Sequence, residues 1–214
     1  MAAEFSRTRG GLPRDLLDLG SYILKGEKAL DLGCGNGRFA ELFDAADYTG
    51  ADISEELLKI ARRNHPAKEF VLVEPLKLPF ADNSFDSVFC LAVIHHLPSQ
   101  AYRRAFLAEI KRVLKPGGRL VLTAWYLLHQ PKVWGMLTKL AALKLIGRNR
   151  LDPGDSWVPF SSASGEVLAQ RYIHVFSAAG LRRLVCRQSF KIESVRLVKR
   201  GKNRNIEVVA LKPS

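Results

Sequence analysis

Short apolar runs alternate with amphipathic stretches along most of the chain. The runs are rich in Val, Ile, Leu and Phe, as strands buried on both faces of a sheet usually are. The stretches between them repeat their apolar residues at helical spacing. Repeated strand–helix alternation predicts a mainly parallel sheet with right-handed crossovers and helices on both faces. The expected strands are residues 28–32, 48–53, 70–73, 86–93 and 119–125, and the expected helices are residues 12–25, 36–43, 54–63 and 99–114.

This alternation ends after the fifth expected strand. Residues 127–165 hold a basic helical stretch and then a loop rich in Pro, Gly and Ser, and we expect this insertion to form a cap on the substrate side. Residues 178–187 predict a further helix. The last two strands, 191–198 and 205–211, are close in sequence and are therefore expected to pair antiparallel. No second core-forming pattern is visible, so we predict one α/β domain over residues 1–214, with a seven-stranded sheet whose last strand pair is antiparallel.

One loop carries the strongest chemical signal. The segment Asp31-Leu32-Gly33-Cys34-Gly35-Asn36-Gly37 lies between the first expected strand and the next helix. Glycines at such a turn let the backbone bend sharply and approach a ligand with no side chain in the way. Asp31 precedes the first glycine, where its carboxylate can accept a hydrogen bond from an amino group. Asp52 ends the second expected strand, where a carboxylate can bind both hydroxyls of a ribose. The spacing Gly-x-Gly-x-Gly differs from the Gly-x-Gly-x-x-Gly of dinucleotide enzymes.

These segments resemble motifs I and II of the class I S-adenosylmethionine-dependent methyltransferases, which have a Rossmann-like fold. Val73-Glu74-Pro75-Leu76 falls where that family binds the adenine, although family members usually have Asp at the position of Glu74. The stretch from Phe85 to Cys90 and the turn Leu114-Lys115-Pro116-Gly117-Gly118 also fit. The resemblance covers about residues 27–125 and implies S-adenosylmethionine as the methyl donor, with no metal. The residues that it implies for cofactor binding are Asp31, Gly33, Gly35, Gly37, Asp52, Ile53, Glu74, Pro75, Leu76 and Leu91.

The net charge of the chain favours some classes of binding partner over others. The chain has 33 Lys and Arg against 21 Asp and Glu, a formal net charge of +12. A strongly basic enzyme suits a polyanionic substrate such as RNA, although a solvated basic surface gives the same number. No apolar run is long enough to cross a bilayer, and the first residues lack the apolar core of a signal peptide. The three cysteines fit neither a zinc pattern nor a disulfide framework. We therefore expect a cytoplasmic protein with no membrane partner.

Four regions outside the cofactor motifs are candidates for binding the acceptor. Phe5-Ser6-Arg7-Thr8-Arg9 precedes the first helix, Ala92-Val93-Ile94-His95-His96-Leu97 follows the fourth strand, and Thr123-Ala124-Trp125 ends the fifth. The fourth region joins Trp157-Val158-Pro159-Phe160 with Arg171-Tyr172-Ile173-His174-Val175-Phe176. Together they resemble the tRNA wobble-uridine methyltransferases, which esterify the carboxylate of 5-carboxymethyluridine. Phe160 and Ile173 stand where that family has Trp and Tyr. The resemblance implies a tRNA carboxyl O-methyltransferase with tRNA as its substrate.

Ester formation from a carboxylate needs a cation rather than a base. A carboxylate has an ordinary pKa of about 4, so it is already ionised at neutral pH. Arginine suits the role because its planar guanidinium binds a carboxylate through two hydrogen bonds. We expect Arg9 first and Arg171 second to supply this cation. Trp125 and Tyr172 are expected to stack on the uracil.

Two adjacent histidines follow the fourth expected strand. Alternation along an extended chain directs one of them toward the ligand crevice. We assign that position to His96 and regard His95 as a core residue. His96 is expected to position the acceptor rather than to remove a proton, because a carboxylate has no proton to lose.

Two other classes of function stay open. The segments Val-Ile-His-His-Leu-Pro and Lys-Pro-Gly-Gly also allow a methyltransferase for a small lipophilic molecule, such as a quinone precursor. A basic RNA-binding module could keep the fold without the reaction, although the intact glycine loop and both acids argue against it. The basic insertion could lie on a membrane or contact phosphates. We expect it to pack on the sheet and to contact RNA.

A partner subunit is also implied by the resemblance. The tRNA-modifying family commonly works with a small zinc-binding activator that adds a strand beside the edge of the sheet. In the expected strand order, the strand from Phe70 to Val73 is that edge. It is short and apolar, which suits pairing by β-augmentation. The alternative is a chain that acts alone behind a short protected edge.

Overall fold

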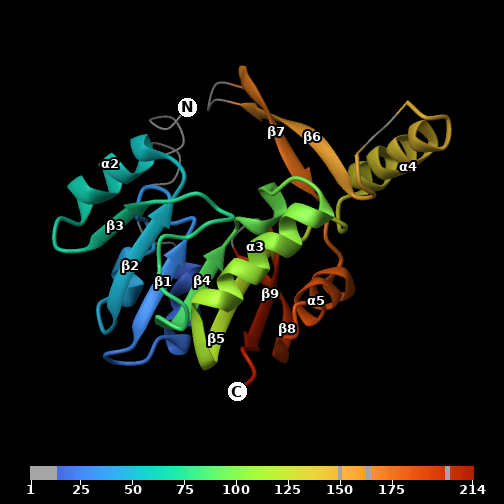
Figure 1. Ribbon diagram of the computed structural model, residues 1–214. Helices are drawn as coiled ribbons and strands as arrows, with labels where there is room; N and C mark the ends of the chain where they lie inside the picture. Colours follow the sequence, from blue (N-terminus) through green and yellow to red (C-terminus); the bar gives the residue numbers. More distant parts are fainter. Residues whose placement is uncertain (1–13, 149–150, 162–164, 201–202) are drawn as a thin grey trace.

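Buried apolar runs form the strands of one mixed sheet, as the sequence predicts. The computed structural model describes residues 14–148, 151–161, 165–200 and 203–214. Within these ranges, the strands of the large sheet are β1 (Lys28–Leu32), β2 (Asp47–Asp52), β3 (Glu69–Leu72), β4 (Phe85–Leu91), β5 (Leu114–Trp125), β8 (Lys191–Arg200) and β9 (Asn203–Leu211). Their order across the sheet is β3-β2-β1-β4-β5-β9-β8 (Figure 1).

The first five strands run parallel to one another. β1 pairs with β2 and β4, β3 pairs with β2, and β5 pairs with β4. β9 is antiparallel to both β5 and β8. This confirms the predicted seven-stranded sheet and its antiparallel C-terminal pair. It also leaves β3 at one edge, as expected for the strand from Phe70 to Val73.

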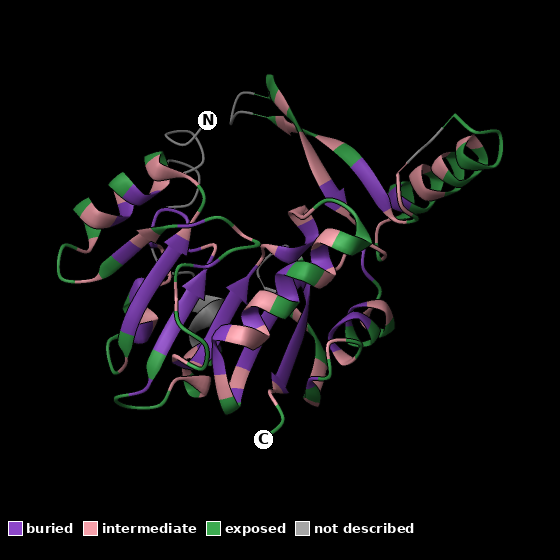
Figure 2. Cartoon of the chain, viewed as in Figure 1, coloured by how far each residue is buried: buried purple, intermediate pink, exposed green. Residues whose placement is uncertain are grey.

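Helices cover both faces of the sheet. Alternate residues of β4 point to opposite faces, so that Val88 and Cys90 join one apolar cluster and Phe89 and Leu91 join the other. All four are buried, and β4 is buried along most of its length (Figure 2). The first cluster is completed by α3 (Gln100–Val113) and α5 (Ala178–Cys186), and the second by the 3₁₀ helices η1 (Arg14–Tyr22) and η2 (Ala40–Phe43) and by α2 (Glu55–Asn64).

Helix α2 begins where the sequence predicts. The hydroxyl of Ser54 accepts a hydrogen bond from the backbone N–H of Leu57, so it satisfies one of the donors left open at the helix N-terminus. The helix expected for residues 36–43 is wrong in its first half, because Gly37 has φ +76° and only η2 forms. Of the helix expected for residues 12–25, residues 14–22 form the 3₁₀ helix η1 and residues 23–25 are not helical.

Strand β4 ends two residues earlier than predicted. Ala92 has φ +59°, in the left-handed region that a side chain disfavours, and this turns the chain out of the sheet. The 3₁₀ turn η3 (Ile94–His96) follows, so the two histidines lie in a turn rather than on an extended strand.

A helix and a hairpin follow β5 and are together called the cap; the hairpin extends beyond the predicted insertion, and a position on the substrate side stays a prediction. α4 (Pro131–Leu145) confirms the predicted helical stretch, but part of the predicted loop is wrong, because β6 (Asp155–Ser161) and β7 (Val167–His174) pair antiparallel. An apolar cluster that includes Val133 and Ile173 packs the cap against Trp125. β7 lies against η3, above the carboxyl end of β4, whereas α4 extends away from the sheet (Figure 1).

Within the described ranges, no helix is long and apolar enough to cross a membrane. In the same part of the chain, no group of three or more His, Cys, Asp or Glu side chains is arranged to bind a metal ion. Cys34, Cys90 and Cys186 are all free thiols.

Candidate active site

The glycine loop after β1 is folded tightly against its neighbours. The backbone N–H groups of Gly33 and Cys34 both donate to the carbonyl of Ala51, over 2.7 and 3.1 Å. Gly33 has φ +84°, and a Cβ there would lie 2.2 Å from Cγ2 of Val93. Only glycine fits this position, for reasons of both backbone conformation and space. The loop therefore presents bare backbone at the carboxyl end of β1, as the motif predicts.

Asp52 is fixed at the end of β2 by two backbone donors. Its Oδ2 accepts from the N–H of Gly35 at 2.8 Å, and its Oδ1 accepts from the N–H of Ser54 at 2.9 Å. Burial raises the pKa of this carboxyl, and the backbone hydrogen bonds oppose the shift. A carboxylate oxygen can accept more than one hydrogen bond, so both oxygens keep capacity for hydroxyl donors. This geometry fits the two hydroxyls of a ribose.

Asp31 lies deeper, on β1, and is 1% exposed. Its Oδ2 accepts a 3.2 Å hydrogen bond from the hydroxyl of Tyr48, whereas Oδ1 has no hydrogen-bond partner in the part of the chain that the structure describes. Burial raises the pKa of Asp31 to about 7; the Tyr48 hydrogen bond lowers it, and the charge of Asp52 raises it further. A buried carboxylate oxygen without a donor is a vacant acceptor, so Asp31 fits the positively charged amino group of S-adenosylmethionine.

The other predicted cofactor residues lie along the same edge of the sheet. Ile53 is exposed directly after β2, and Leu91 is buried at the end of β4. Glu74 and Leu76 are exposed and Pro75 is half-buried, in a turn after β3 that is closed by a bond from the N–H of Lys77 to the carbonyl of Glu74. Parallel strands bring all their carboxyl ends to one side, so the structure gathers these residues near the glycine loop. Their roles in binding adenine stay predictions.

Among the residues predicted for the acceptor site, Trp125 and the two histidines form an aromatic group at the ends of β4 and β5. The ring of His95 is 4.4 Å from that of Trp125, and the ring of His96 is 5.2 Å from it at 82°. His95 is 1% exposed and His96 is half-buried. Nδ1 of His96 lies 3.0 Å from the carbonyl oxygen of Tyr172, and because a carbonyl only accepts, Nδ1 is the donor there.

Arg171, from β7, lies over this aromatic group. Its guanidinium carbon is 4.7 Å from the ring centroid of Trp125 and 5.6 Å from that of Phe160. The side chain is half-buried, and Nε is buried with no hydrogen-bond partner within the described ranges. Burial lowers the pKa of the guanidinium and is the only cause of the shift, so no carboxylate of the described ranges pairs with it. Arg171 is a cation held at the strand ends without an anion among the described residues.

Tyr172 points to the other side of β7. Its hydroxyl oxygen lies 3.0 Å from Nη1 of Arg103 and 3.2 Å from the N–H of Ser99, and burial is the main cause that raises its pKa to about 12. Its ring meets that of Trp157 edge-on at 5.7 Å. The structure thus brings together His96, Trp125 and Arg171 as a group, with Tyr172 behind them. Stacking of Tyr172 on a uracil stays a prediction, and Arg9 lies outside the described residues.

The sequence did not predict the side chains that bind the hairpin to helix α3. Arg103 and Asp155 are each 2% exposed and pair with each other, and Asp155 also contacts His174. A signal for the first existed: Arg103 precedes Phe106 and Leu107 at spacings of three and four, on the apolar stripe of α3. A charged residue in a buried stripe predicts a buried partner.

Comparisons with known proteins place the chain among methyltransferases. Residues 30–122 match the family model described as Methyltransferase domain. A protein of Encephalitozoon cuniculi named as a methyltransferase is 34% identical over 194 residues, covering 88% of this chain and 82% of that protein. A tRNA (carboxymethyluridine(34)-5-O)-methyltransferase of Arabidopsis thaliana is 32% identical over 125 residues, 58% of this chain, and this chain spans only 30% of that protein. A phthiotriol/phenolphthiotriol dimycocerosates methyltransferase of Mycobacterium ulcerans is 38% identical over 106 residues, 47% of this chain and 38% of that protein.

Solved structures share the fold. A protein of Methanosarcina mazei, described as a SAM-dependent methyltransferase, superposes with a TM-score of 0.76 at 22% identity, covering 92% of this chain and 97% of that one. A Haloferax volcanii methyltransferase chain, solved in complex with the Trm112 methyltransferase activator, superposes with a TM-score of 0.65 at 16% identity, covering 94% of this chain and 89% of that one.

Proposed function

Because this chain belongs to the S-adenosylmethionine-dependent methyltransferases, we propose that it methylates a carboxylate, that of 5-carboxymethyluridine at the wobble position of tRNA. The observation that carries the proposal is Arg171, a half-buried guanidinium without a described anion, over Trp125 at the strand ends. Burying a cation without its counter-charge is unfavourable, so such a residue is usually completed by a ligand. The Arabidopsis relative is named as a tRNA (carboxymethyluridine(34)-5-O)-methyltransferase, and the carboxylate of a carboxymethyl group would be an anion that pairs with Arg171.

Each side chain has a defined task in this mechanism. The glycine loop, Asp31 and Asp52 hold S-adenosylmethionine, which supplies an electrophilic methyl group on a sulfonium sulfur. Arg171 pairs with the acceptor carboxylate and holds it beside Trp125. No residue is needed as a base, because the acceptor is ionised at neutral pH. His96, oriented by its bond to the carbonyl of Tyr172, positions the acceptor.

RNA as the carrier of the acceptor is supported by the charge of the chain. The net charge is +12, and no Asp or Glu occurs between Glu109 and Asp152. The exposed cap helix α4 therefore carries only positive charges, at Lys132, Lys139 and Lys144. Lysines at such a surface pair with phosphates, and each such contact adds to the salt dependence of binding.

An activator subunit is the second partner that we propose. β3 is the edge of the sheet, and Leu72 at its end is half exposed, which leaves backbone groups and an apolar side chain for an added strand. The Haloferax relative of the same fold was solved with its activator. If the proposal holds, adding an activator of this class raises turnover and protects the amides of β3 from hydrogen exchange. Full activity of the purified chain alone, with no gain on addition, contradicts it.

A small lipophilic acceptor is the second candidate function. The C-terminal end of α4 exposes apolar side chains, with Leu145 89% exposed and Ile146 largely so. The Mycobacterium relative is named for a lipid substrate. An exposed apolar, basic helix suits the surface of an anionic membrane, where such an acceptor is found.

One assay separates the two candidates. Radiolabelled S-adenosylmethionine is incubated with the protein and either total tRNA or a lipid extract. We expect label on tRNA, and we expect mild alkali to release it as methanol, because a methyl ester is base-labile whereas methylated rings and ethers are not. Arg171→Ala should reduce labelling strongly, and Arg171→Lys should restore it only in part, since an ammonium lacks the planar fork. Label in the lipid extract, or alkali-stable label on tRNA, contradicts the carboxylate proposal.

A further inference from the structure

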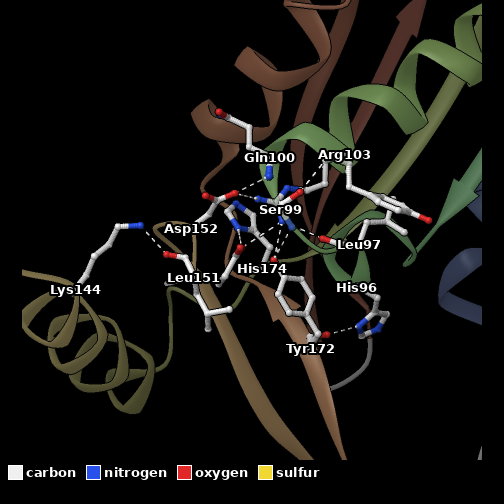
Figure 3. Close-up of polar contacts among 12 residues, drawn as sticks. His96, Leu97, Ser99, Gln100, Arg103, Lys144, Leu151, Asp152, Tyr172 and His174 are labelled. Carbon is white, nitrogen blue, oxygen red and sulfur yellow. Dashed lines mark hydrogen bonds and ion pairs between the residues drawn. The ribbon is translucent and has the colours of Figure 1, made fainter. Parts of the chain in front are cut away.

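A buried ion pair joins the cap to the body of the protein. Arg103 lies in the first turn of α3, and its Nη1 is within hydrogen-bond distance of three oxygens, as Figure 3 shows. The distances are 2.9 Å to the carbonyl of Leu97, 3.0 Å to the hydroxyl of Tyr172 and 3.2 Å to Oδ1 of Asp155. The first oxygen belongs to the turn after η3, and the other two belong to the hairpin. One guanidinium therefore connects α3 with the end of the 3₁₀ turn η3 and with both strands of the hairpin.

The carboxylate of this pair has a second partner in the hairpin. Oδ1 of Asp155 lies 2.6 Å from Nδ1 of His174, its register partner across the hairpin. Burial raises the pKa of Asp155, but the hydrogen bonds from His174 and Tyr172 and the charge of Arg103 lower it overall. Asp155 is therefore a buried carboxylate held by His174 and Tyr172 of the hairpin and by the positive charge of Arg103 on α3. Without Arg103, its buried negative charge would lose its full counter-charge.

Tyr172 connects this pair to the acceptor site. Its hydroxyl is bound to Arg103, and its carbonyl oxygen receives Nδ1–H of His96. Arg171 directly precedes Tyr172 on β7. Alternation along the strand directs its side chain to the opposite side, over Trp125. A shift of β7 relative to α3 would therefore displace the guanidinium of Arg171 and change the orientation of His96 together.

We propose that Arg103 is a positioning residue for the acceptor: it acts through Asp155 and Tyr172 to hold β7 where Arg171 can bind the acceptor anion. The inference rests on the proposed function insofar as Arg171 binds the acceptor. The residues of the glycine loop and Asp52 are bound by β2 and α2 rather than by the hairpin. Arg103 thus governs the acceptor side and leaves donor binding unchanged.

The test compares Arg103→Met with Arg103→Lys. Arg103→Met should raise the KM for tRNA at least tenfold, with the Kd for S-adenosylhomocysteine unchanged within twofold. Arg103→Lys keeps a charge for Asp155 but cannot reach all three oxygens, so its KM should lie between those of Arg103→Met and the parent protein. Hydrogen exchange of the β7 amides should accelerate in the same order, while the amides of β1 and β4 keep their protection.

Two further variants keep the test decisive if Arg103→Met does not fold. Tyr172→Phe removes only the hydroxyl and leaves the carbonyl for His96, so it should change KM in the same direction. The pair Arg103→Met with Asp155→Leu removes both charges and avoids a lone buried carboxylate. Arg112→Met is the matched control, because Arg112 lies near the other end of α3. This variant loses the ion pairs to Glu109 and Asp82, so it should lower the stability of the protein without changing the KM for tRNA.

Failure of the proposed function and failure of the Arg103 proposal would give different results in these measurements. Exchange of the β7 amides and cofactor affinity need no acceptor, so they test Arg103 even if the parent protein does not methylate tRNA. Equal losses of donor and acceptor affinity in the Arg103 variants would overturn the proposal. So would unchanged exchange in β7, or a rise in KM for Arg112→Met as large as that for Arg103→Met.

Discussion

Cofactor affinity should depend on pH through Asp31. Burial raises the pKa of this carboxyl from 3.8 to about 7, and Oδ1 has no hydrogen-bond partner among the described residues. In the free protein Asp31 is therefore largely protonated below pH 7. A positively charged amino group placed against Oδ1 favours the ionised form and lowers the pKa again. Binding then releases a proton in the range between the two pKa values.

The size of the effect follows from this shift. A rise of about three units corresponds to about 4 kcal/mol of preference for the neutral carboxyl. If binding restores a pKa below 5, apparent affinity should increase by up to tenfold per pH unit as pH rises from 5 toward 7, roughly 50-fold in all, and level off above 7. The stability of the free protein changes in the opposite direction: the contribution of protonated Asp31 is full below pH 3.8 and is lost as pH rises through 7.

Titration calorimetry with S-adenosylhomocysteine between pH 5 and 8 measures the effect. Repeating it in two buffers of different ionisation enthalpy counts the protons released. Asp31→Asn is the matched control, because it keeps the acceptor for the Tyr48 hydroxyl and cannot titrate. It should bind more weakly at pH 7.5, with little change from pH 5 to 7, and it should be more stable than the parent protein at pH 8. A parent protein with constant affinity and no proton release between pH 5 and 7 would refute the reasoning.

Three further predictions concern the loop, the ribose site and RNA. Asp52→Ala should weaken cofactor binding at least tenfold by calorimetry, because hydrogen bonds to a charged acceptor contribute roughly 1.5–3 kcal/mol each. Gly33→Ala should destabilise the protein by about 2 kcal/mol or more in denaturant melts, because its Cβ would meet Val93, whereas Gly117→Ala, with φ +74° but open space, should lose only about 1 kcal/mol. tRNA affinity should fall at least tenfold between about 50 and 200 mM salt in a filter-binding assay if several lysines contact phosphates, and a flat response would favour the lipophilic acceptor.

The donor half of the molecule could be predicted because its signals are local. A strand buried on both faces appears as a continuous apolar run, so β1 has the predicted bounds. The glycine loop and Asp52 come within a short stretch of chain, and their geometry follows from a turn and a strand end. The structure differs in some boundaries and in helix type: positive φ at Ala92 ends β4 early, and positive φ at Gly37 leaves only the 3₁₀ helix η2 of the helix expected for residues 36–43.

The histidine pair shows an expectation that agrees with the structure for a different physical reason. Alternation on an extended strand predicts one buried and one accessible ring, and His95 is indeed the more buried of the two. Yet both lie in the 3₁₀ turn η3, where successive side chains diverge around a helical axis rather than across a sheet. The role of His96 toward an acceptor stays a prediction.

The hairpin could not be predicted because its stability is not local. Pro159 and the flanking glycines indicate a loop, but a two-stranded ribbon has open edges that tolerate proline. Its pairing is supported by Ile173 packing on Val133, and by Asp155 reaching Arg103 on another helix. Neither partner is visible in the hairpin sequence itself.

This difference between the two halves has a consequence for specificity. The proposed donor site is made from the sheet and its loops, whereas the proposed acceptor site needs Arg171 brought from β7 to Trp125 at the end of β5. Contacts between distant segments set that approach, among them the apolar cluster around Ile173, the buried pair of Arg103 with Asp155 and the bonds of Tyr172 to Arg103 and His96. Substitutions in the cap can therefore change which acceptor is bound while the binding of the methyl donor stays intact. The same reasoning explains why motifs shared across the fold identify the donor, and why the acceptor must be argued from the cap.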